Sequence, residues 1–302
     1  MDSKGIRLFE KRDSKAVVKL FNNNSEWDKL TENLLHEKVF EDPSYEKELN
    51  LTAWEGKKLI GFLSGVTREI ESEKTGYIKL MVVAADHRRK GVGRSFYEKL
   101  ENAFRERGMN KIRVYDVPYN YFMPGIDPRY TPAVAFFETM GFRRFSDTAN
   151  MKVNLNKANL DTDRALAELS GKGIEIARAA GEDKEQTMKF LEKYFPGWKY
   201  EVSRAFQSKP VSLFIAKSAG KVVSFSAYDC NNRGTGWFGP MGTSPDARGM
   251  GIGGILLKKC LEDIKESGLK EAIIPWVGPI RFYSYHVNAV VERVFWRYEK
   301  LL

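Results

Sequence analysis

Two glycine-rich stretches carry most of the information in this sequence: Arg88-Arg89-Lys90-Gly91-Val92-Gly93-Arg94-Ser95 and Arg248-Gly249-Met250-Gly251-Ile252-Gly253-Gly254. After each set of glycines, apolar residues recur three and four positions apart, which indicates an amphipathic helix. Glycine permits a positive φ and a close approach of the backbone, and the first amides of a helix have no intrahelical acceptor. Because such a helix start binds phosphate well, the sequence predicts two phosphate-binding turns.

The two turns belong to a longer internal repeat. The segments that begin at Gly5 and Gly173 resemble each other, and AWEGKKLIGF (53–62) resembles AKSAGKVVSF (216–225). Further along, FFETMGF (136–142) loosely resembles FYSYHV (282–287). The matches keep their order, which predicts two copies of one domain whose loops differ in length. The largest difference is an extra stretch of the first copy, roughly residues 118–131, before its last helix.

Each copy is predicted to run strand, helices, strands, glycine turn, helix, strand, helix, strand. We predict an N-terminal domain at 1–155, a polar linker at 156–172 with a short helix from near Asp161, and a C-terminal domain at 173–302. Strands are expected at 49–54, 58–66, 77–84 and 111–117, and again at 211–217, 221–229, 236–241 and 272–276.

Composition narrows the function. The chain has 302 residues and a net charge of +9, which suits nucleic acid, an anionic membrane surface, a polyanionic small ligand, or solubility alone. It has no apolar run of the ~18 residues that a membrane span needs, and no apolar segment near its first residues that indicates a secretory signal. Two cysteines and three scattered histidines predict neither a disulfide framework nor a metal site, so we expect a cytoplasmic protein.

Two common nucleotide motifs do not fit. Gly249-x-Gly251-x-x-Gly254 formally matches the dinucleotide fingerprint, but the polar segment SPDAR precedes it where a hydrophobic strand is needed. The next strand ends in Pro275-Trp276 rather than in an acidic residue, and the first copy lacks the third glycine. The sequence also contains no GxxxxGK[ST] loop.

Both stretches match the pattern R/Q-x-x-G-x-G/A, at residues 88–93 and 248–253, which resembles the pyrophosphate loop of the GNAT acetyltransferase superfamily. Downstream, FFETMGF resembles that family's FYEKLGF helix, and FYSYHV resembles it less fully. The resemblance covers nearly the whole chain, which is similar to tandem members such as the mycothiol-synthase-like proteins. It implies an α/β (α+β) fold of two tandem GNAT-like domains, each a mixed, mostly antiparallel sheet flanked by helices.

The resemblance also implies that the chain binds acetyl-CoA and needs no metal. The pyrophosphate is implied to lie on the turn amides, and the pantetheine arm beside the preceding strand. The implied cofactor-binding residues are Val82, Val83, Arg88, Arg89, Lys90, Gly91, Val92, Gly93, Arg94 and Ser95 in the first copy, and Gly242, Thr243, Arg248, Gly249, Met250, Gly251, Ile252, Gly253 and Gly254 in the second.

The family often uses the tyrosine of the FYEKLGF helix as a proton donor to the departing thiolate. Tyr283 occupies that position in the second copy, whereas the first copy has Phe137, which has no proton to donate. Tyr130 is an alternative donor in the first copy, and Tyr285 in the second if the alignment slips by two residues. For the general base, Glu201, Asp229, Glu292 and a water relay stay open, and His87 is expected to face solvent.

The sequence therefore predicts an N-acetyltransferase for the primary amine of a small molecule, such as an amino sugar, with the chemistry in the C-terminal copy. Aromatic residues in apparent loops suit either the stacking of such an acceptor or the packing of the loops: Tyr119, Tyr121, Phe122, Tyr130, Trp198 and Tyr200. The alternative is a CoA-binding regulatory or scaffold protein without turnover. No nucleic-acid or membrane partner is expected, because the basic residues are dispersed, and both a monomer and a homodimer stay open.

Overall fold

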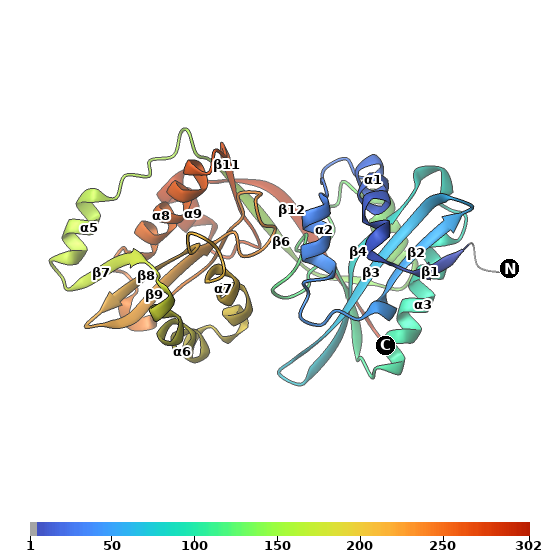
Figure 1. Ribbon diagram of the computed structural model, residues 1–302, viewed down its shortest axis with the longest axis horizontal. Coiled ribbons are helices and arrows are strands. Elements are labelled where there is room, and N and C mark those ends of the chain that lie inside the picture. The colour runs from blue at the N-terminus through green and yellow to red at the C-terminus, as the bar shows by residue number, and fades with distance from the viewer. Residues whose placement is uncertain (1–4) are drawn as a thin grey trace. The chain divides into compact units, whose positions relative to one another are not determined.

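The computed structural model describes residues 5–302, so the first four residues of the predicted N-terminal domain lie outside it. The chain forms two compact units. The first contains the chain up to Asp147 together with Phe295–Leu302, and the second contains Thr148–Val294 (Figure 1).

The first unit is built on an array of strands in the order β1-β2-β3-β4-β5-β12, which is part of an eight-stranded sheet. All neighbours are antiparallel except β4 and β5, which are parallel. The strands are β1 (Ile6–Leu8), β2 (Asn50–Glu55), β3 (Lys58–Ile70), β4 (Glu73–Val83), β5 (Lys111–Val114) and β12 (Val290–Leu301). The helices are α1 (Ser14–Asn24), α2 (Glu32–Val39), α3 (Val92–Glu106) and α4 (Thr131–Thr139).

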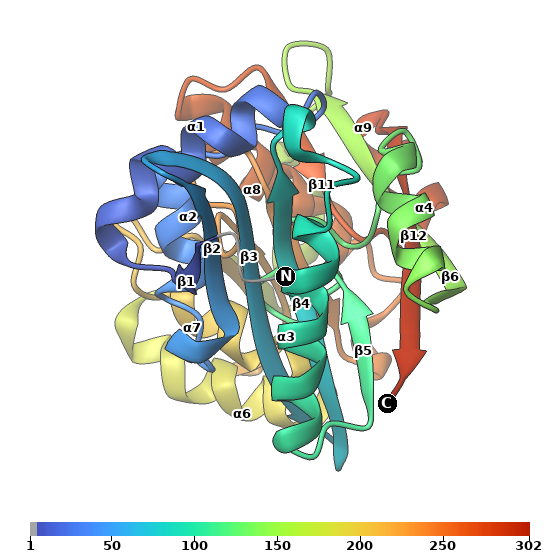
Figure 2. The ribbon, with the colours of Figure 1, turned by 90° about the vertical axis from the view of Figure 1, so that its right-hand side faces the viewer.

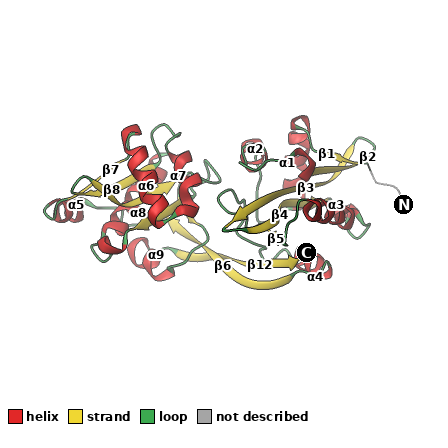
Figure 3. Ribbon diagram, turned by 90° about the horizontal axis from the view of Figure 1, so that it is seen from below, coloured by secondary structure: helices red, strands yellow, loops and turns green. Residues whose placement is uncertain are grey.

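Helix α3 crosses one face of this array in front of β3 and β4 (Figure 2). Its apolar stripe of Phe96, Leu100 and Phe104 packs against Gly61, Gly65 and Gly76, where an added Cβ atom would lie within 2.7 Å of a ring or methyl carbon. Helices α1 and α2 cover the opposite face (Figure 3). The stripe was predicted from its four-residue spacing, and the structure confirms that it faces the core.

The second unit repeats this plan. Four antiparallel strands follow the order β10-β9-β8-β7, and a parallel bridge from Trp237 to Ile273 connects the segment before β10 with β11. The strands are β7 (Ile174–Arg178), β8 (Leu213–Ser218), β9 (Lys221–Tyr228), β10 (Phe238–Thr243) and β11 (Glu271–Ile274). The helices are α5 (Asp163–Ser170), α6 (Lys184–Tyr194), α7 (Lys199–Ala205), α8 (Ile252–Glu266) and α9 (Ile280–Val287). The short helix predicted in the polar linker is α5.

The last strand of each copy completes the sheet of the other copy. Strand β6 (Arg143–Asn154) follows α4, and its residues Met151–Asn154 pair with β11. Strand β12 follows α9, and its residues Glu299–Leu301 pair with β5 (Figure 2). The compact units therefore differ from the predicted sequence ranges at both strands, because 148–155 belong with the second unit and 295–302 with the first.

No helix within residues 5–302 is long and apolar enough to cross a membrane. The same described residues contain no group of three or more His, Cys, Asp or Glu side chains that could hold a metal ion.

Candidate active site

The two glycine turns adopt the same backbone conformation. Gly91 and Gly251 are the N-cap residues of α3 and α8, with φ of 88° and 83°, and no side chain caps either helix. A Cβ atom built on either glycine would meet nothing within 4 Å. The space beside each cap glycine is therefore open, and the first amides of an uncapped helix are the groups that can bind a phosphate.

The arginine that begins each pattern fixes the end of the preceding strand. Arg88 Nε donates to the Val83 carbonyl at 3.2 Å, and Arg248 Nε donates to the Thr243 carbonyl at 3.3 Å. Arg88 also donates to the carbonyl of Asn24, at the end of α1. These two arginines therefore connect the turn to the end of the preceding strand. The positive charge of the arginines, which suggested phosphate binding, did not predict this role.

Each of these strand ends lacks a paired strand on one edge within the described residues. Strand β4 pairs with β5 only from Thr75 to Ile78, so its last residues have no strand partner on that edge within the described chain. In the second unit, the bridge at Trp237 is the point where the β10 segment and β11 meet. The predicted pantetheine positions, Val82 and Val83 in one copy and Gly242 and Thr243 in the other, lie at these strand ends.

The second glycine of each motif contacts an equivalent pair of side chains. A Cβ on Gly93 would lie 3.3 Å from both Met81 and Phe136, and a Cβ on Gly253 would lie 3.4 Å from Met241 and 3.5 Å from Phe282. Helices α4 and α9 are therefore placed alike against their turns. It follows that the next residues, Phe137 and Tyr283, occupy equivalent positions.

Tyr283 is buried, with 8% of its surface exposed, and its ring lies 6.1 Å from that of Phe238 and 5.1 Å from that of Phe282. Burial raises the pKa of Tyr283 to about 12, so the hydroxyl keeps its proton at neutral pH. Within the described residues, its hydroxyl makes no hydrogen bond to a protein group. Phe137, with 1% exposed, packs on Tyr115 at 6.2 Å.

The alternative proton donors occupy other environments. Tyr130 donates to Asp28 at 2.8 Å and accepts from the Trp27 amide at 2.9 Å; burial first, and Asp28 next, raise its pKa to about 12. Tyr285 is 81% exposed, so its side chain lies on the surface, unlike that of Tyr283. The hydroxyl of Tyr130 therefore bonds to Trp27 and Asp28, in the loop after α1.

The prediction for His87 is wrong. His87 is 7% exposed and lies 2.6 Å from Asp86 and 3.0 Å from Glu55. Two carboxylates hold the imidazole in the turn before α3, which explains why it does not face solvent. Of the candidate bases, Glu292 forms an ion pair with Lys152 at 3.0 Å.

The aromatic residues of the extra stretch pack inside the first unit. Tyr121 and Phe122 are each 7% exposed, and Phe122 lies edge-on to Phe21 at 5.7 Å. Tyr119 lies under the guanidinium of Arg68 at 5.0 Å. For these three residues the structure favours packing over acceptor stacking.

Sequence reasoning missed Phe195, the residue after α6. A Cβ on Gly242 would lie 2.7 Å from its ring, so Phe195 covers β10 at a predicted pantetheine position. Its ring stacks on Trp198 at 5.2 Å and packs on Phe225 at 5.9 Å. The glycine in the middle of a predicted strand was the signal that could have indicated a close neighbour.

A glycine turn beside a strand end thus occurs at equivalent places in the two units. The sequence matches the profile of the Acetyltransferase (GNAT) family at residues 17–142 and 180–285, and the chain therefore belongs to this family of acyltransferases. Members of the family generally use acetyl-CoA.

Solved structures share the fold over nearly the whole chain. A glucosamine N-acetyltransferase region of a fungal multi-domain β-N-acetylglucosaminidase is 18% identical with a TM-score of 0.82, over 98% of this chain and 38% of that one. A GCN5-related N-acetyltransferase from Sphaerobacter thermophilus is 15% identical with a TM-score of 0.70, over 98% and 95% of the two chains. A tandem GNAT protein from the clavulanic acid biosynthesis pathway is 12% identical with a TM-score of 0.68, over 98% of each chain. No curated protein matches the sequence.

Proposed function

We propose that this chain is an acetyl-CoA-dependent N-acetyltransferase that acts on the primary amine of a small molecule, with the chemistry in the C-terminal copy. The observation that carries the proposal is the contrast at one position, which is Tyr283 in the second unit and Phe137 in the first. The residue before each of them contacts the equivalent glycine of its turn. Only the second copy offers a hydroxyl there.

The residues of the second copy fit the proposed donor. The amides at the start of α8 would hold the pyrophosphate, and the open space around Gly251 leaves room for it. Arg248 keeps the Thr243 carbonyl in place, and the edge of β10 away from β9 would accept the pantetheine arm as an added strand. When bound, acetyl-CoA supplies the thioester whose acetyl group is transferred.

The side chains of the copy then move protons. Tyr283 is protonated across the neutral range, so its hydroxyl can deliver a proton to the departing sulfur as the carbon–sulfur bond breaks. The acceptor amine must lose a proton to attack. Glu201, Asp229, Glu292 and a water relay are the candidates for that step.

A small-molecule amine, such as an amino sugar, is the proposed acceptor. Its support is the family membership together with the likeness in fold to a protein described as a glucosamine N-acetyltransferase region. The second candidate is a CoA-binding regulatory or scaffold role without turnover. Phe137 favours that role for the first copy, because the copy lacks the tyrosine donor at this position.

The test follows free thiol released from acetyl-CoA in the presence of a panel of amines, with glucosamine and a peptide amine among them. We expect release with a small-molecule amine and not with the peptide. A parallel calorimetric titration with CoA counts the binding sites. If CoA binds but no amine releases thiol, the regulatory role replaces the enzyme.

A further inference from the structure

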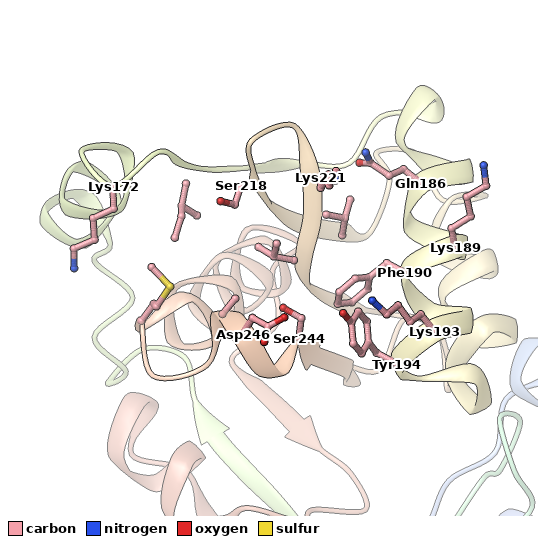
Figure 4. A pocket seen from close by; sticks show the side chains of 15 residues that line it. Lys172, Gln186, Lys189, Phe190, Lys193, Tyr194, Ser218, Lys221, Ser244 and Asp246 are labelled. Atoms are coloured by element: carbon pink, nitrogen blue, oxygen red, sulfur yellow. The ribbon is translucent and has the colours of Figure 1, made fainter.

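An open cavity of about 470 Å³ lies in the second unit, between the turn before α8 and helix α6 (Figure 4). Its volume falls in the range of small-molecule sites. Apolar side chains such as Ile174, Phe190 and Val222 form part of its wall. The polar lining consists of Lys172, Lys189, Lys193, Lys221, Gln186, Tyr194, Ser218, Ser244 and Asp246.

The lining carries an excess of positive charge: four lysines and one carboxylate. Lys193 lies 4.7 Å over the Tyr194 ring, and on α6 the two face Ser244 and Asp246 across the cavity (Figure 4). Lys189 pairs with Glu185 at 2.7 Å. Within the described residues, neither Lys172 nor Lys221 has an ion-pair partner.

In the first copy, the side chains at the corresponding positions bond to one another. Lys58, the counterpart of Lys221, bonds to Asp86 at 2.6 Å. His87 bridges Asp86 and Glu55, and Asn24 accepts from the Ala85 amide at 2.7 Å. In the second copy, Ala247 replaces His87, Ser218 replaces Glu55 and Tyr194 replaces Asn24. The second copy therefore lacks the imidazole and one of the two carboxylates that lie near the lysine in the first copy.

The cavity is not the proposed pantetheine site. Its walls come from β7, β8, β9 and α6, on the β9 side of β10, whereas the proposed arm would add on the opposite edge of β10, toward β11. The two sites share only the turn that contains Ser244, Ala247 and Met250. A ligand in the cavity would therefore contact that turn from the side away from the arm.

We propose that the cavity binds a second ligand, a small organic phosphate such as a sugar phosphate or a nucleotide, separately from CoA. Lysine ammonium groups are compact charges that pair well with phosphate oxygens, and the two serine hydroxyls can add hydrogen bonds. The apolar wall suits an organic body better than a bare inorganic ion. Contact with the shared turn would couple this ligand to the conformation of the phosphate-binding loop.

The proposal is tested by calorimetric titration of the full chain, saturated with desulfo-CoA, with glucose 6-phosphate and with ADP. We expect binding of at least one probe. The Lys193→Gln/Lys221→Gln variant should weaken it about tenfold or more, as expected for the loss of charge-assisted hydrogen bonds. Lys265→Gln, an exposed lysine at the end of α8, is the matched control and should leave it unchanged.

A second variant tests the comparison between the copies. Ser218→Glu/Ala247→His installs the residues of the first copy, and it should abolish probe binding while CoA titration shows an intact fold. Equal probe binding in all variants overturns the proposal, as does the absence of probe binding. If the probe binds the chain without desulfo-CoA but not the saturated chain, the cavity is part of the CoA site and the claim of a separate ligand is wrong. A chain that binds the probe but releases no thiol overturns only the proposed enzyme activity.

Discussion

Replacing Tyr283 by phenylalanine removes one oxygen atom from the position that separates the two copies. The ring would keep its contacts with Phe238 and Phe282, so the packing of α9 should persist. The hydroxyl makes no hydrogen bond to a described protein group, and its loss should therefore change the free energy of unfolding by less than about 1 kcal/mol.

The effect on catalysis should be much larger. A positioned general acid contributes about 10²–10⁴-fold to a rate, so the turnover of Tyr283→Phe should fall by that factor. In the protein that retains Tyr283, the turnover should not fall between pH 7 and 10 through ionisation of this tyrosine. The raised pKa of about 12 means that the folded protein retains this proton over the whole interval.

The assay measures thiol release at saturating acetyl-CoA and amine, beside a denaturant titration of each variant. Phe137→Tyr is the matched control, since it adds the hydroxyl at the equivalent position of the first copy and should leave the rate of the second copy unchanged. An unchanged turnover in Tyr283→Phe, with CoA binding intact, would refute the assignment of the proton donor. A fall explained by unfolding would instead appear in the denaturant titration.

Three further predictions concern the framework. Gly251→Ala places a side chain at φ 83°, which should cost about 1–2 kcal/mol and weaken CoA binding in a calorimetric titration; equal affinity would contradict the proposed role of the turn. Deletion of residues 295–302 removes more than half of β12, including the residues that pair with β5, so amide hydrogen exchange should accelerate in β5 and stay unchanged in β8. Asp42→Asn leaves Lys79 and Arg68 buried without their carboxylate, which should cost about 3–5 kcal/mol in chemical denaturation at pH 7. Burial tends to raise the pKa of Asp42, but the two cations outweigh it and lower that pKa to about 2; its contribution to stability is therefore present above about pH 3.8 and lost as the pH falls toward 2.

Local patterns made most of the elements predictable. The four-residue spacing of apolar residues after Gly91 predicted α3, and the glycines predicted turns with positive φ. The strand expected at 111–117 ends early, at Val114, because Tyr115 adopts a φ of 68° that a strand does not accommodate. This departure depends on the tertiary setting, and nothing in the local composition indicates it.

The exchange of the last strands, β6 and β12, could not be predicted from local sequence for a different reason. The sequences of β6 and β12 indicate strands, but either could pair within its own copy or with the other, since pairing is decided by long-range contacts. Phe295 and Tyr298, at 0% and 1% exposed, are buried in the first unit although they follow the second copy's last helix. Expressing either sequence repeat alone would therefore omit a strand that its sheet needs.

The two copies differ where side chains, rather than the backbone, decide the chemistry. Both retain the arginine on the strand carbonyl, the left-handed glycine, and the methionine and phenylalanine against the second glycine. These features shape a turn, and a turn can bind a phosphate without any reaction. The second copy has the hydroxyl of Tyr283 and the lysine-lined cavity, whereas the equivalent positions of the first copy carry Phe137 and side chains that bond to one another. Both differences fall in the second copy, which is the copy that we propose to carry the chemistry.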